Sequence, residues 1–107
     1  MFKVKELIEL FGKENVICTS DDVLIQSVEH DTRRIKPNSL YVAIRGTNLD
    51  GHDFVKDAVQ KGAVACIVEK KIADVNIAQI VVEDSVKAYG KLASYWRDKL
   101  NYPIIGV

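Results

Sequence analysis

Apolar side chains near the start of the chain recur with the period of an α-helix. Val4, Leu7, Ile8 and Phe11 stand at positions i, i+3, i+4 and i+7, which places them along one side of a helix. Gly12 follows them, and glycine is typical of the residue after a helix C-terminus. The pattern predicts a short amphipathic helix that ends at Gly12.

The next two apolar stretches have no helical period. "NVICTS" (15–20) and "VLIQSVEHD" (23–31) are rich in β-branched residues, and the polar pair Asp21 and Asp22 separates them. Such composition favours strands. We therefore expect one strand in each stretch.

The middle of the chain reads as strand, loop, helix and strand. "LYVAIRG" (40–46) and "AVACIVE" (63–69) are almost continuously apolar, as strands buried on both faces are. Between them, Asp50 can cap a helix that Gly62 ends. Its apolar stripe would comprise Phe54, Val55, Ala58 and Val59. If the two strands are parallel, this is a βαβ unit; Pro37 just before it predicts a type I turn.

The last third predicts a strand at "QIVVED" (79–84) and a long helix that begins at Asp84 or Ser85. One face of that helix would carry Val86, Tyr89, Leu92, Ala93, Trp96 and Leu100. Asn101 and Pro103 would end it. The final "PIIGV" (103–107) looks like the start of a buried strand.

Together these elements predict a small single α/β domain. We expect a mixed sheet of about five strands with two to three helices, containing the βαβ unit. The 107 residues suffice for one domain with a real core. We place that domain at residues 1–102, with 103–107 as the start of a further domain.

Charge narrows the possible partners. Fifteen basic residues balance fifteen acidic ones, which argues against a general affinity for nucleic acid or a membrane surface. No apolar stretch approaches the roughly 20 residues that span a bilayer, and the N-terminus does not resemble a signal peptide. We expect a cytoplasmic protein whose Cys18 and Cys66 are buried free thiols.

Two polar segments follow predicted strands and are candidates for chemistry. They are "HDTRR" (30–34) and "RGTNLDGHD" (45–53), and the second leads into a helix N-terminus. Ligands collect at such strand ends, where loop N–H groups favour negative charge. Gly46 and Gly51 would let a ligand approach the backbone, Thr32, Thr47 and Asn48 offer hydrogen bonds, and Arg33 and Arg45 could fork onto a phosphate.

A purely structural interpretation of the same residues stays open. Asp50 with Asp53 is what a helix cap looks like, and Arg33, Arg34 and Lys36 could be a solvated edge. No phosphate-binding fingerprint is present. His30 and His52 lack a third ligand, so we expect no metal site, and no nucleophile stands beside a base, so we expect no catalytic residue.

The stretch "DTRRIKPNSLYVAIRGTNLDGHDFVKDAVQKGAVACIVE" closely resembles the N-terminal domain of the Mur ligases that extend UDP-N-acetylmuramoyl peptides. That family carries D-[ST]-R, then P-G-x-L-F-[VI]-A-[LI]-x-G, D-G-H-x-F and A-x-x-x-G-A. The resemblance spans residues 28–69 and continues to the last residue.

The resemblance implies an ATP-dependent, amide-forming ligase of peptidoglycan precursor synthesis. This domain would hold the UDP end of the substrate and would be inactive alone, with no cofactor of its own. ATP and Mg²⁺ would bind in the missing central domain, and the incoming amine in the missing C-terminal domain. The link after the last helix favours the branch that adds D-alanyl-D-alanine to the tripeptide over the branch that adds the third peptide residue.

The resemblance also assigns residues to the ligand. Thr32 would contact the uridine or diphosphate beside His30, Thr47, Asn48 and Leu49 would line the uracil and ribose, and Asp50, Gly51 and His52 would shape the loop. With the residue-based candidates, the full predicted set is His30, Thr32, Arg33, Arg45, Gly46, Thr47, Asn48, Leu49, Asp50 and His52.

Two positions depart from the family pattern: Asn38 replaces the turn glycine and Tyr41 replaces Phe. Neither belongs to the implied contacts, but the turn at Asn38 is in doubt, although Asn tolerates a left-handed backbone. A different class of function also stays open. The chain could be a freestanding, non-catalytic interaction module that docks another protein through Tyr95, Trp96 and Tyr102.

Overall fold

A mixed sheet of five strands, in the order β2-β7-β6-β5-β4, organises the chain. The computed structural model describes residues 2–17, 22–46 and 49–100, with 96–100 as backbone only. The strands of this sheet are β2 (Val16–Ile17), β4 (Ser27–Glu29), β5 (Ser39–Val42), β6 (Ala63–Val68) and β7 (Ala78–Val81). β4 to β7 are mutually parallel, and β2 lies antiparallel to β7 at one edge. The predicted fold class is confirmed.

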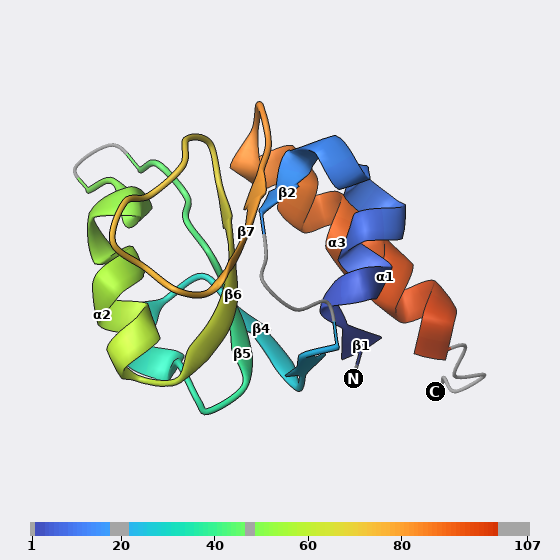
Figure 1. Ribbon diagram of the computed structural model, residues 1–107, viewed down its shortest axis with the longest axis horizontal. Helices are drawn as coiled ribbons and strands as arrows, with labels where there is room; N and C mark the ends of the chain where they lie inside the picture. The colour runs from blue at the N-terminus through green and yellow to red at the C-terminus, as the bar shows by residue number, and fades with distance from the viewer. Residues whose placement is uncertain (1, 18–21, 47–48, 101–107) are drawn as a thin grey trace.

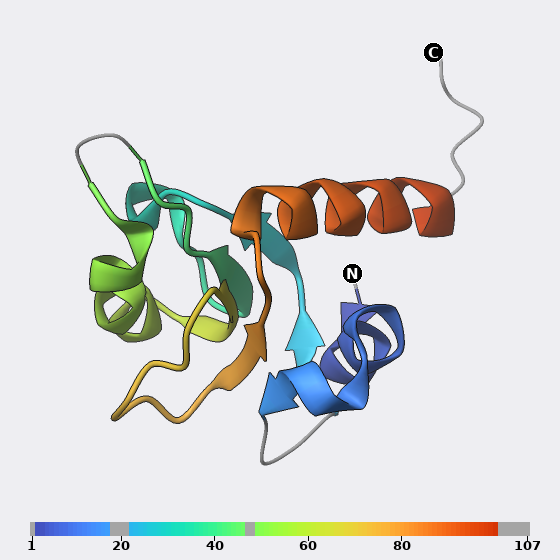
Figure 2. The same cartoon turned by 90° about the horizontal axis from the view of Figure 1, so that it is seen from above.

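Helices cover both faces of the sheet (Figure 1). The helix α2 (Val55–Gln60) lies on one face, while α1 (Val4–Phe11) and α3 (Ser85–Leu100) lie on the other, as the second view also shows (Figure 2). A two-stranded antiparallel sheet, β1 (Phe2–Lys3) with β3 (Leu24–Ile25), stands beside α1. Three 3-10 turns complete the fold: η1 (Lys13–Asn15), η2 (Thr32–Arg34) and η3 (Gly51–Phe54).

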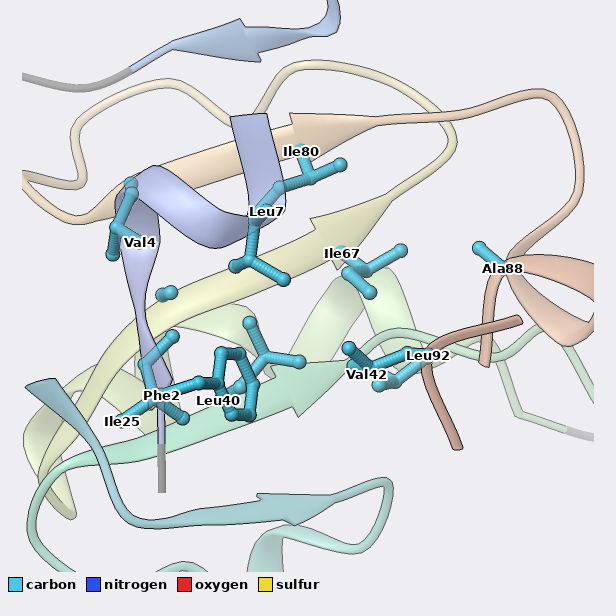
Figure 3. Close-up of a cluster of buried hydrophobic side chains, with 12 residues drawn as sticks. Phe2, Val4, Leu7, Ile25, Leu40, Val42, Ile67, Ile80, Ala88 and Leu92 are labelled. Carbon is cyan, nitrogen blue, oxygen red and sulfur yellow. The ribbon is translucent and has the colours of Figure 1, made fainter. Parts of the chain in front are cut away.

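Alternation along β5 divides the core into two halves. Leu40 and Val42 join the cluster beneath α1 and α3, whereas Tyr41 and Ala43 join the cluster beneath α2. Leu40, Tyr41 and Val42 of β5, and Ala43 just after it, are all buried, as the continuous apolar run predicted. Figure 3 shows the first cluster, which contains Phe2, Val4, Leu7, Ile25, Leu40, Val42, Ala65, Ile67, Ala78, Ile80, Ala88 and Leu92.

The helix and βαβ predictions hold where the structure describes them. α1 ends at Phe11, and Gly12 follows it with φ 93°. β5, α2 and β6 form the unit with parallel strands, and η3 provides the first turn before α2. No helix within the described residues is long and apolar enough to cross a membrane.

Two details of the predicted strands and turns are wrong. The stretch 23–31 is two strands, because β3 pairs with β1 while β4 pairs with β5, and the exposed Gln26 lies between them. The turn at Pro37 is not type I, because Asn38 has φ 65°, which belongs to the third position of a type II turn. The left-handed backbone at Asn38 confirms that asparagine can take the place of glycine there.

The buried face of α3 is also rotated from the predicted stripe. Ser85, Ala88 and Leu92 are buried, Tyr89 is half-buried, and Val86 is 59% exposed. The Ser85 N–H donates to Glu69 Oε2 at 3.0 Å, and Ala88 and Leu92 join the core cluster. Ala93 is exposed. The predicted contributions of the Trp96 and Leu100 side chains, and the helix stop at 101–103, lie outside the described residues.

Cys66 is a buried free thiol, as predicted. Burial raises its pKa to about 12. The neutral thiol therefore packs as a small apolar side chain in the cluster beneath α2. Cys18 lies outside the described residues.

Candidate functional site

A cavity of about 740 Å³ opens at the carboxyl ends of β4 and β5. Its walls come from the segment that follows β4 and from the loop that joins β5 to η3. The lining residues are His30, Asp31, Thr32, Arg33, Tyr41, Ile44, Gly46, Leu49, Gly51 and Phe54. A volume of this size is within the range of small-molecule sites, and strand ends are where ligands of open α/β sheets bind.

The first wall is the turn that η2 makes after β4. The Asp31 carboxylate accepts hydrogen bonds from the Arg33 backbone N–H at 2.9 Å and from the Arg33 guanidinium at 2.8 Å. The guanidinium hydrogen bond, followed by the backbone one, lowers the pKa of Asp31 to about 2. Arg33 is thus folded back along the turn, with a side chain that is 86% exposed. The Arg33 guanidinium is therefore paired with the Asp31 carboxylate where the residue lines the cavity.

Thr32 and His30 stand beside this pair. The Thr32 carbonyl accepts a hydrogen bond from Lys61 Nζ at 3.2 Å, and the His30 ring meets Tyr89 edge-on with centroids 5.6 Å apart. Among the described residues, neither the Thr32 hydroxyl nor the His30 ring takes part in a hydrogen bond. Both groups are therefore available to a ligand in the cavity.

The second wall is the loop after β5, which closes on itself. Arg45 and Asp50 form an isolated antiparallel bridge, and the Gly46 N–H donates to the Leu49 carbonyl at 2.7 Å. Leu49 leaves a 67% exposed apolar side chain beside the cavity. Thr47 and Asn48 lie outside the described residues.

Gly51 is required by the close approach of this loop to β5. Its N–H donates to the Ile44 carbonyl at 2.9 Å, and a Cβ at Gly51 would lie 2.7 Å from the Ile44 nitrogen. The Tyr41 hydroxyl donates to the Gly51 carbonyl at 2.9 Å. Burial raises the pKa of Tyr41 to about 12. The hydroxyl stays protonated and holds the loop against the strand.

Asp50 and His52 are hydrogen-bonded to each other at the start of η3, just before α2. Asp50 Oδ1 accepts the His52 backbone N–H at 3.0 Å and lies 2.6 Å from His52 Nδ1, while His52 Nε2 accepts the Glu69 N–H at 2.7 Å. Because Nε2 is an acceptor, the proton of the neutral ring resides on Nδ1 and points at Asp50. The His52 N–H, and then its ring, hold the pKa of Asp50 below its usual value. His52 is buried, with both ring nitrogens occupied inside the protein.

The structure divides the predicted site residues into two groups. His30, Thr32, Arg33, Gly46 and Leu49 line the cavity. Arg45, Asp50 and His52 do not line it. Their side chains contact one another through Asp50, which lies against Arg45 and against the His52 ring.

The predicted set left out Asp31, Tyr41, Ile44 and Phe54, which also line the cavity, as does Gly51, which was expected to shape the loop. Tyr41, which stands where the family pattern has Phe, was expected to lie outside the implied contacts. The alternation of Leu40, Tyr41 and Val42 along β5 could have indicated that Tyr41 faces away from its neighbours, toward the loop.

Within the described residues, no group of three or more His, Cys, Asp or Glu side chains is placed to hold a metal ion. His52 makes its contacts to Asp50 and Glu69, and His30 makes its contact to Tyr89. The groups that line the cavity, among the described residues, are polar side chains, loop backbone and apolar side chains.

Comparison with known proteins identifies the class. The sequence model of the Mur ligase family, catalytic domain, matches residues 24–97. The chain belongs to the Mur ligase family.

Two kinds of ligase are among its relatives. A UDP-N-acetylmuramoyl-tripeptide–D-alanyl-D-alanine ligase of Buchnera aphidicola is 41% identical over 90 residues, covering 83% of this chain and 20% of the relative. A UDP-N-acetylmuramoyl-L-alanyl-D-glutamate–2,6-diaminopimelate ligase of Listeria monocytogenes is 43% identical over 77 residues, covering 72% of this chain and 16% of the relative. The chain thus spans about a fifth of the length of such ligases.

Solved structures agree with this assignment. MurF from Acinetobacter baumannii superposes with a TM-score of 0.73 at 29% identity, over 92% of this chain and 21% of that one. The MurF ligase of Thermotoga maritima, solved in complex with ADP, gives a TM-score of 0.63 at 30% identity, over 75% of this chain and 18% of that one.

Proposed function

We propose that this chain binds the UDP portion of UDP-N-acetylmuramoyl-tripeptide in the cavity at the ends of β4 and β5. The observation that carries the proposal is the location of that cavity. The "DTR" and "GTNLDGH" segments, which carry the family resemblance, both contribute to its walls.

The chemistry of the walls suits the two parts of UDP. The free Thr32 hydroxyl and His30 ring, together with Arg33, offer donors to a diphosphate. Leu49, with Phe54, offers apolar surface to a uracil ring. Thr47 and Asn48 complete the uracil and ribose contacts in this proposal.

In the whole protein, this domain would present the substrate to an ATP site in the central domain. The γ-phosphoryl group of ATP, bound with Mg²⁺ there, would pass to the peptide carboxylate with release of ADP. The amine of D-alanyl-D-alanine would then attack the acyl phosphate, forming the amide bond and releasing inorganic phosphate and a proton. The missing domains are accordingly its partners within the same chain, and the reaction belongs to peptidoglycan precursor synthesis in the cytoplasm. We favour D-alanyl-D-alanine as the incoming group, as in the Buchnera relative, over the third peptide residue.

The alternative of a freestanding interaction module has less support. It needs Tyr95 as an exposed anchor, but Tyr95 is half-buried and its hydroxyl donates to Glu6 Oε1 at 3.2 Å. Tyr95 thus joins α3 to α1. The side chains of Trp96 and Tyr102 lie outside the described residues.

Calorimetric titration of UDP and of UDP-N-acetylmuramoyl-tripeptide into the 107-residue chain tests the proposal. We expect saturable binding of both, weakened about tenfold or more by Thr32→Ala and by Asn48→Ala, since each loses a hydrogen bond to a charged or buried polar group. Asn76→Ala, an exposed asparagine of the loop before β7, is the matched control and should bind as the wild type does. Absence of UDP binding by the wild-type chain would overturn the proposal, and equal binding by both site variants would remove the residue assignment.

A further inference from the structure

Glu69, the residue that follows β6, contacts both α3 and the loop that joins β5 to η3 (43–50), called the ligand loop below. Its backbone N–H donates to His52 Nε2 at 2.7 Å, and its Oε2 accepts the Ser85 N–H at 3.0 Å. Its Oε1 lies 3.7 Å from Arg45 Nη2. Three separate atoms of one residue thus reach the first turn of α3, the helix entry at His52 and the start of the loop at Arg45.

Arg45 connects Glu69 to both ends of the loop. Arg45 is held between two carboxylates, because its Nε also lies 3.6 Å from Asp50 Oδ2. Arg45 and Asp50 are the two residues of the bridge that closes the loop, so the ion pairs act on both of its ends. Glu69 is less exposed than Arg45, with side chains 22% and 59% exposed. The carboxylate is held by the Ser85 N–H, and the guanidinium of Arg45 lies against it.

We propose that Glu69 is a positioning residue for the ligand loop: it holds Arg45 and His52 in register with α3 and thereby keeps the loop in its ligand-binding arrangement. The part of this inference that concerns affinity rests on the proposed UDP site. The part that concerns the loop itself does not need a ligand. Arg45, which sequence reasoning assigned to phosphate, acts in this arrangement on the protein rather than on the ligand.

Glu69→Gln isolates the charged contact. The Gln side chain keeps an acceptor oxygen for the Ser85 N–H, and its backbone N–H still reaches His52, so only the attraction to Arg45 is lost. Glu83→Gln is the matched control, since Glu83 is exposed and lies just before the same helix. Both substitutions remove one negative charge from the same region of the surface.

Two measurements read the result. Hydrogen exchange of the ligand-free chain, followed by NMR, reports on the Gly46 and Gly51 amides, which donate within the loop and to Ile44. The Asn38 amide, which donates to Gly62 at the opposite ends of the strands, is the internal reference. Calorimetry with UDP then measures affinity.

We expect Glu69→Gln to accelerate exchange of the Gly46 and Gly51 amides about two- to fivefold, the factor that a partly exposed ion pair provides, and to raise the Kd for UDP by a similar factor. Asn38 exchange and the Glu83→Gln variant should match the wild type. Unchanged loop exchange would overturn the inference, as would equal acceleration of all three amides, which indicates general destabilisation. If the wild-type chain does not bind UDP, the proposed function fails, while the exchange rates still decide the role of Glu69.

Discussion

The difference in unfolding free energy between the wild type and Tyr41→Phe should change sign with pH. Tyr41 is 2% exposed, and its hydroxyl donates to the Gly51 carbonyl at 2.9 Å. Tyr41→Phe removes this hydrogen bond and leaves the carbonyl without it. At neutral pH, we therefore expect the variant to lose about 1 kcal/mol of unfolding free energy.

The loss of wild-type stability at alkaline pH follows from the pKa of Tyr41, which burial raises from 10.0 to about 12. Between these two values, the unfolded chain loses the phenolic proton while the folded chain keeps it. The contribution of this group is thus fully present below pH 10 and declines as pH rises toward 12, by about 1.4 kcal/mol at pH 11. The Phe variant has no such group, and its other titrating residues are those of the wild type.

The two stability curves should therefore cross between about pH 10 and pH 11, with the Phe variant the more stable above the crossing. Urea denaturation followed by far-UV circular dichroism, at pH 7, 9.5, 10.5 and 11, measures both chains under matched conditions. A stability difference that stays constant over this range would refute the reasoning, and so would a difference that grows in favour of the wild type.

Two further substitutions probe the loop and the core. Gly51→Ala should lower the unfolding free energy by about 1–3 kcal/mol, because its Cβ would lie 2.7 Å from the Ile44 nitrogen. Urea denaturation measures this change, and a midpoint equal to that of the wild type would contradict the prediction. In a Cys18→Ser chain, Cys66 should react with a disulfide reagent at about pH 8 only as the chain unfolds, because burial raises its pKa to about 12. Reaction of the folded chain as fast as in denaturing urea would contradict this.

Hydrophobic periodicity predicted an element correctly where its own sequence shows which of its faces are buried. The stripe Val4, Leu7, Ile8 and Phe11 gave α1 correctly because a surface helix has a single apolar face. The continuous apolar runs gave β5 and β6 correctly because helices cover both faces of the sheet. In such elements, local sequence and burial carry the same information.

Periodicity failed where a polar contact from elsewhere in the chain decides. The stripe through Val86 fits helical spacing, yet Val86 is exposed while Ser85, whose N–H donates to Glu69, is buried. The assignment of Arg45 to a phosphate stays a prediction, and the sequence pattern did not show that Asp50 and Glu69 lie against its guanidinium. The stretch 23–31 was split because its two halves find different partner strands. None of these partners is near in sequence to the residue that it controls, apart from Asp50.

The antiparallel strand β2 has a consequence for how the protein is made. Val16 pairs with Ile80, and Val4 and Leu7 of α1 share a core cluster with Leu92 of α3. α1 precedes β5, β6, β7 and α3 in the chain, so its apolar stripe leaves the ribosome before most of the residues that bury it. Residues 78–92 must be synthesised before α1 can pack into its native cluster.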